Sequence, residues 1–99
     1  GYLIMDGLIS LHSAYDVQLA LAEAVKLRRK QKKWSRQTLA ERSGVPAATI
    51  KHFESTGQIS LRQFLLLWQM LDALEPLLEL SKTKQPIPKT IEDVLSMRG

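Results

Sequence analysis

Apolar residues recur along most of this chain at intervals of three and four positions, the spacing of one face of an α-helix. The first stripe comprises Leu19, Leu21, Ala22, Val25 and Leu27. It predicts a helix that ends at about Lys30 and starts after Asp16 or Ser13, because such short polar side chains accept hydrogen bonds from the first-turn amides. Residues 1–13 have no clear period and are expected to form an irregular arm.

Two shorter helices follow and meet at a glycine. Ser35 can cap a helix over residues 36–42, and Gly44 suits its end, where the backbone is usually left-handed. Pro46 fits the first turn of a third helix, residues 46–54, because its missing N–H costs nothing there. The pattern therefore predicts a pair of short helices with a tight turn between them.

The remaining periodic segment is rich in leucine. Ser60 and Gln63 form a capping-box pattern before a fourth helix over about residues 61–74. Its core face is expected to comprise Leu61, Phe64, Leu65, Trp68 and Leu71 or Asp72. Pro76 closes this helix or begins a short fifth one, and a polar, proline-marked linker and a short amphipathic segment follow. The prediction is an all-α fold: an arm over residues 1–15, a compact domain of four to five helices over 16–80, and a linker with a tail over 81–99.

Charge is distributed unevenly. The net charge is +4, yet between Lys26 and Arg62 ten Lys and Arg residues face only Glu41 and Glu54, a local balance of +8. The first helix ends in a basic cluster of Lys26, Arg28, Arg29, Lys30, Lys32 and Lys33. A basic middle favours a polyanion-binding surface, although a solvated basic helix face remains an alternative.

Several site types are not expected. The chain has no cysteine and only two distant histidines, which argues against disulfides and metal sites and fits a reducing cytoplasm. No cofactor is expected, and the longest apolar run, residues 64–68, is far too short to span a bilayer. An enzyme is not expected either, because no carboxylate pair, nucleophile–base pair or glycine-rich phosphate loop is present.

The two short helices carry a recognisable constellation. Leu39 and Ala40 precede Gly44 and Val45, and Ile50 and Phe53 then share the buried face of the third helix. This is the layout of a helix-turn-helix, whose second helix lies in the DNA major groove. The segment "WSRQTLAERSGVPAATIKHFESTGQISLRQFLLL" resembles the lambda-repressor-like, or Xre/Cro, helix-turn-helix family over roughly residues 17–74.

The resemblance implies roles for individual residues. Arg36 and Thr49 match positions that contact phosphate, and the base-reading positions fall on Ala47, Ala48, Lys51 and His52. Gln37, Lys32 and Lys33 are further DNA-binding candidates beside the groove. Alanine makes no bidentate hydrogen bonds, but its methyl group can pack on the thymine methyl, so affinity is expected to depend mainly on phosphate contacts. Trp34 is expected in the core rather than stacked on bases.

Leucines exceed what one core face needs. The surplus, expected at a dimer or partner interface, comprises Leu66, Leu67, Met70, Leu74, Leu77 and Leu78. Ile91, Val94 and Leu95 give the tail an apolar face suited to partner binding. A larger core closed by the fifth helix and the arm is the alternative.

The stretch "LDALEPLL" and the short tail resemble HipB-like antitoxins, which accompany HipA-like kinase toxins and repress their shared operon. The functional hypothesis is a homodimeric transcriptional repressor that binds a palindromic double-stranded operator and a HipA-like partner. The alternative is a protein-interaction module that uses the helices as a scaffold without specific DNA binding.

Overall fold

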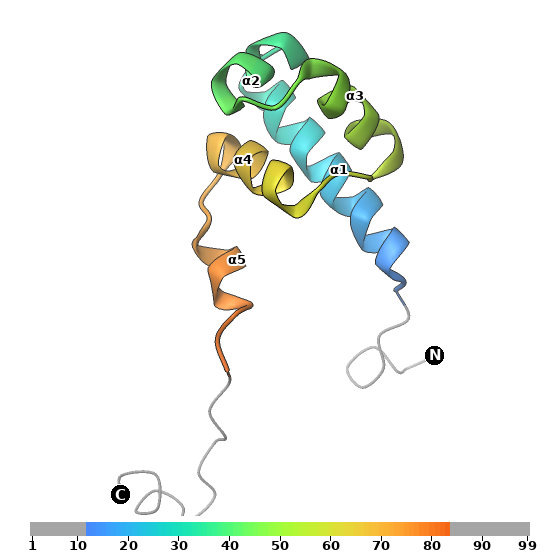
Figure 1. Ribbon diagram of the computed structural model, residues 1–99, viewed down its shortest axis with the longest axis vertical. Helices are drawn as coiled ribbons and strands as arrows, with labels where there is room; N and C mark the ends of the chain where they lie inside the picture. The colour runs from blue at the N-terminus through green and yellow to red at the C-terminus, as the bar shows by residue number, and fades with distance from the viewer. Residues whose placement is uncertain (1–11, 84–99) are drawn as a thin grey trace, which may run out of the picture.

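The computed structural model describes residues 12–83, and every regular element in that range is an α-helix. The helices are α1 (Ala14–Gln31), α2 (Arg36–Ser43), α3 (Ala47–Thr56), α4 (Leu61–Leu71) and α5 (Glu75–Glu79). Helix α1 packs against both α3 and α4, α2 packs against α3 and α4, and α5 extends beyond the end of α4 (Figure 1). The predicted all-α fold of four to five helices is confirmed, whereas Ile91, Val94, Leu95 and most of the arm lie outside the described residues.

The helix ends follow the polar residues of the sequence. Ser13 caps α1, and its Oγ accepts from the Asp16 N–H while the Asp16 carboxylate accepts from the Ser13 N–H, each at 3.1 Å. The backbone and side-chain hydrogen bonds from Ser13 lower the pKa of Asp16. Both residues named from the sequence therefore belong to one reciprocal cap. Pro46 is the N-cap of α3 rather than part of its first turn, so α3 begins one residue later than predicted.

The core lies where α1, α2, α3 and α4 meet. Its buried apolar residues are Ala22, Val25, Leu39, Val45, Ile50, Phe53, Phe64, Leu67 and Leu71. The rings of Phe53 and Phe64 meet edge to face, with centroids 6.0 Å apart, which joins α3 to α4. The inward positions predicted for Ile50 and Phe53 are confirmed.

Helix α4 differs from the prediction. Leu61 is 73% exposed, whereas Leu67 is fully buried, so the core stripe consists of Phe64, Leu67 and Leu71. A helix that is apolar on nearly all sides does not reveal from its own sequence which side packs inward. The assignment of Leu67 to a dimer or partner interface is therefore wrong, because no surface atom of this side chain is left for a partner to contact.

Helix α4 also ends at Leu71, three residues earlier than predicted. Asp72 takes an extended backbone conformation there, and its carboxylate accepts hydrogen bonds from Arg28 and from the Ala73 N–H. These bonds lower the pKa of the exposed Asp72 carboxyl, the bond from Arg28 contributing most. None of the helices between residues 12 and 83 is both long and apolar enough to cross a membrane.

Candidate nucleic-acid interface

The turn between α2 and α3 is held by backbone geometry and one buried hydroxyl. Gly44 has φ 80° and donates its N–H to the Ala40 carbonyl at 2.9 Å, which ends α2. The Oγ of the buried Ser43 accepts from the Val45 N–H at 3.1 Å. A Cβ atom at Gly44 would meet no atom within 4 Å, so the left-handed backbone is what requires glycine there. The turn thus sets the angle at which α3 leaves α2.

Helix α3 has a buried face and an exposed one. Ile50 and Phe53 are 0% and 2% exposed, whereas Ala48, Lys51 and His52 lie on the surface. Ala47 and Thr49 are half-buried at its first turn. The structure thus places Ala48, Lys51 and His52 on the outside of α3, as predicted, with Ala47 more covered than Ala48.

The start of α3 has no side-chain cap. Pro46 occupies the N-cap position and makes no capping hydrogen bond through its side chain. The first-turn amides are therefore flanked by small alanine side chains and face no capping oxygen. Such amides carry the positive end of the helix dipole, which favours an anion such as phosphate.

Basic and polar residues border α2. Lys32 and Lys33 are exposed in the turn after α1, and Lys33 has a positive φ of 60°. Gln37 is exposed and donates to Glu41 at 3.4 Å. Trp34 is half-buried against the core, as predicted, and the guanidinium carbon of Arg42 lies 4.5 Å from its ring centroid. That contact occupies the ring, so Trp34 is a packing residue.

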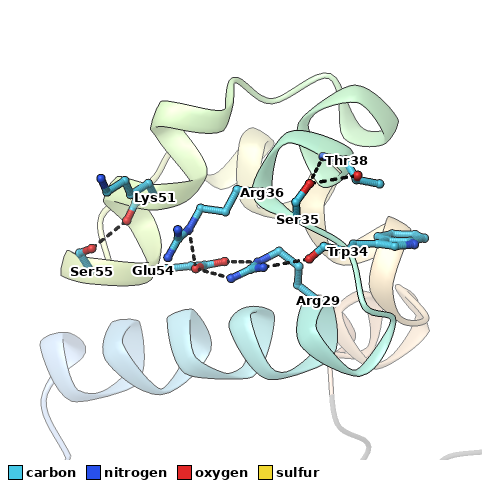
Figure 2. Close-up of polar contacts among 8 residues, drawn as sticks. All are labelled: Arg29, Trp34, Ser35, Arg36, Thr38, Lys51, Glu54 and Ser55. Atoms are coloured by element: carbon cyan, nitrogen blue, oxygen red, sulfur yellow. Dashed lines mark hydrogen bonds and ion pairs between the residues drawn. The ribbon is translucent and has the colours of Figure 1, made fainter.

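The sequence did not reveal an ionic cluster beneath α3, which Figure 2 shows in close-up. Arg29 donates from Nε to Glu54 Oε2 at 2.8 Å and from Nη2 to Glu54 Oε1 at 3.0 Å. Arg36 donates from Nε to the same Oε1 at 3.0 Å, and Arg29 Nη1 donates to the Trp34 carbonyl at 2.9 Å. The three charged side chains connect α1, α2 and α3.

Burial separates the members of this cluster. The side chains of Arg29 and Glu54 are 7% and 2% exposed, and that of Arg36 is 39% exposed. Burial alone raises the pKa of Glu54, but the hydrogen bonds and positive charges of Arg29 and Arg36 outweigh it, so the pKa lies below its ordinary value. Arg29, assigned from the sequence to the exposed basic cluster, is a buried ion-pair residue instead. One feature of the sequence does indicate this burial: Arg29 lies four residues after Val25 and seven after Ala22, so it shares the buried face of α1.

A second surface is apolar and lies on α4 and α5. Leu66, Met70, Leu74 and Leu77 are half-buried, and Leu78 is 59% exposed. A shallow groove beside Leu66 is lined by Leu61, Arg62, Leu65, Leu66 and Gln69. Apart from Leu67, the residues between 66 and 78 that were assigned to an interface therefore keep surface that a partner can contact.

A comparison with known protein families assigns the central residues. Within residues 12–83, no three acidic or histidine side chains gather closely enough to hold a metal ion. Residues 25–72, from the second half of α1 to the end of α4, match the family model described as Helix-turn-helix. No match was found among curated proteins or among solved structures. Residues 25–72 therefore match a helix-turn-helix domain of the Xre or lambda-repressor-like kind, whose members are typically DNA-binding transcription regulators.

Proposed function

We propose that this protein is a sequence-specific transcriptional repressor that binds double-stranded DNA with α3 in the major groove. The observation that carries the proposal is the exposed face of α3, where Ala48, Lys51 and His52 lie opposite the buried Ile50 and Phe53. A recognition helix requires this arrangement, because its inner face must fix it to the domain while its outer face meets the base edges.

The proposed readout combines close approach with few hydrogen bonds. The methyl groups of Ala47 and Ala48 let the start of α3 approach the bases and favour thymine, whose C5-methyl projects into the major groove. Lys51 and His52 supply donors for guanine N7 and O6 or, in the case of Lys51, for phosphate. This readout specifies few base pairs per domain.

Phosphate contacts then supply most of the affinity. Lys32 and Lys33 are exposed beside α2, Arg36 and Gln37 lie at the start of α2, and Thr49 lies in the first turn of α3. Lysine and arginine side chains that neutralise phosphates release counterions, so binding weakens steeply as salt rises. We expect these residues to position the domain on the duplex and to carry little sequence information.

We further propose that the protein acts as a homodimer on a palindromic operator, with half-sites one or two helical turns apart. The support is the apolar surface of α4, α5 and the residue after α5, where Leu78 is 59% and Leu80 is 80% exposed. Exposed leucines that lie together favour contact with another protein surface, and a twofold dimer would double the limited readout of one domain.

The biological setting we propose is a toxin–antitoxin operon in which this chain represses transcription and binds a HipA-like kinase toxin. This part rests on the resemblance of "LDALEPLL" to HipB-like antitoxins, together with the partly exposed Leu74, Leu77 and Leu78 of that stretch. Co-purification of the untagged chain with the product of the adjacent gene tests it. The absence of any complex would remove the toxin from the proposal and leave the repressor.

The DNA-binding proposal is tested with a labelled duplex from the region upstream of the protein's own gene and with a scrambled duplex of equal composition. The dissociation constant is measured by fluorescence anisotropy between 50 and 200 mM salt. We expect tighter binding to the upstream duplex, and Lys51→Ala should weaken binding and reduce the salt slope by about 1. Lys82→Ala is the matched control, because Lys82 lies outside α2 and α3 and pairs with Glu79, the last residue of α5.

Two results would contradict this reading. Binding that does not depend on salt, or equal binding by wild type and Lys51→Ala at every salt concentration, would favour the protein-interaction module.

The proposed dimer is tested by a separate experiment, which measures the molar mass by light scattering over a range of protein concentrations. Leu78→Glu should give a monomer, whereas Leu27→Glu, at a site on α1 that is 50% exposed, should leave the mass unchanged.

A further inference from the structure

The carboxylate of Glu54 is shared unequally between two arginines. Arg29 binds both of its oxygens, and the remaining nitrogen of the Arg29 guanidinium donates to the Trp34 carbonyl. All three nitrogens of Arg29 are engaged, and its side chain is only 7% exposed, so burial keeps it from an outside ligand. Arg29 and Glu54 therefore form a buried ion pair that carries no net charge.

Arg36 is the surplus charge of the cluster. Two arginines face one carboxylate, so the cluster carries a net charge of +1, and the exposed member is Arg36. Within the described part of the chain, only its Nε has a hydrogen-bond partner, Glu54 Oε1. Both Nη groups of a half-exposed guanidinium thus remain for an anion.

The location of this guanidinium matters as much as its charge. Arg36 is the first residue of α2, and its side chain reaches α3 at Glu54 (Figure 2). Glu54 lies three residues after Lys51 on α3. Residues three apart are neighbours on a helix surface, so the Arg36 guanidinium meets α3 beside the edge that carries Lys51. Lys51 is exposed on the face assigned to DNA.

We propose that Glu54 is a positioning residue for DNA binding: it holds Arg36 by Nε and directs the two Nη groups toward a DNA phosphate. This proposal rests on the proposed function and adds a buried residue that never touches DNA. The physical basis is preorganisation, since a long arginine side chain that is already held in place loses less conformational freedom when it binds phosphate. Because Arg29 already balances the charge of Glu54, the carboxylate orients Arg36 without cancelling the attraction of the cluster for an anion.

A double-mutant cycle tests this coupling on the upstream duplex at fixed salt, with wild type, Glu54→Gln, Arg36→Gln and the double variant. We expect Arg36→Gln to weaken binding about tenfold, the effect of losing one charge-assisted hydrogen-bonded contact. Glu54→Gln should weaken binding several-fold when Arg36 is present and change it less than about twofold when residue 36 is glutamine. A purely structural role for Glu54 would weaken binding by the same factor in both backgrounds and would overturn the inference, as would tighter binding by Glu54→Gln.

Arg36→Lys supplies a second readout that does not require any change at Glu54. Lysine keeps the charge but has no Nε–H through which Glu54 can orient a planar fork. We therefore expect weaker binding than wild type with an unchanged salt slope, whereas wild-type affinity for Arg36→Lys would overturn the inference. Thermal melts verify that each variant is folded. A wild-type protein without salt-dependent binding refutes the proposed function, whereas salt-dependent binding without coupling refutes this inference alone.

Discussion

Replacing Arg29 by methionine should destabilise the domain by about 3–5 kcal/mol, the usual cost of removing one partner of a buried ion pair. The structure supplies the reason. Glu54, only 2% exposed, would lose two of its three charge-assisted hydrogen bonds, and the Trp34 carbonyl would lose its donor. A chain of this size is stable by about 5–15 kcal/mol, so the loss is a large share of the total. The melting temperature should fall by more than about 10 °C.

A matched control lies one residue earlier on the same helix. Arg28 also forms an ion pair through Nε, with Asp72 at 2.9 Å, but the two side chains are 34% and 45% exposed. Water screens such a pair, so Arg28→Met should cost only about 1 kcal/mol, part of it from the lost contact with Trp68. Urea denaturation at pH 7, followed by far-UV circular dichroism at two protein concentrations, measures both losses.

The result that would refute the reasoning is an equal loss in the two variants, or a loss below about 1 kcal/mol for Arg29→Met, because burial is then not what decides the energy. The double variant Arg29→Met/Glu54→Leu adds a second check. It removes both buried charges and replaces them with apolar atoms, so most of the stability lost in Arg29→Met should return.

Three further predictions concern stability. Because the pKa of Glu54 is lowered in the folded state, its carboxylate stabilises the domain fully above the ordinary value of 4.5, and this stabilisation is lost as the pH falls through the folded-state pKa. Urea titrations from pH 7 to 2.5 should show the free energy of unfolding falling with pH in wild type and falling less in Glu54→Gln. Leu67→Ala should cost about 2–5 kcal/mol, whereas Leu66→Ala should cost about 1 kcal/mol or less in the monomer; equal losses in urea denaturation would contradict the burial of Leu67. Gly44→Ala should lower stability by about 1 kcal/mol through its left-handed backbone, and Gly57→Ala by more, because a Cβ there would lie 3.1 Å from atoms of α1; a larger loss for Gly44→Ala would refute this order.

The sequence predicted the helix-turn-helix well because its signals are local. Gly44 marks a backbone conformation that few other residues adopt, and the spacing of Ile50 and Phe53 leaves only one way to orient α3. About ten residues of sequence are therefore enough to predict which side of α3 faces the core and which side faces the solvent. The DNA contacts assigned to the solvent-facing residues remain predictions.

The errors arose where the deciding contact is distant in sequence. In α4, leucines on almost every side left the inward face undetermined, and contact between Phe53 and Phe64 fixes it so that Leu67 is buried. Arg29 was assigned to the surface because it lies among other cations, and its partner Glu54 is 25 residues away. No local pattern pairs one arginine of a cluster with one distant carboxylate.

The ion pair and the aromatic contact together explain how a ten-residue helix can serve as a reading element. Isolated helices of this length are marginal in water, and "AATIKHFEST" contains β-branched residues and no side-chain cap at its start. Near its C-terminal end, Phe53 packs on α4 while Glu54 is bonded to α1 and α2. The uncapped first turn with Ala47 and Ala48 is thus presented from a fixed base. A substitution at Glu54 should therefore lower the stability of the domain, and the double-mutant cycle separates this loss from the effect on DNA binding that depends on Arg36.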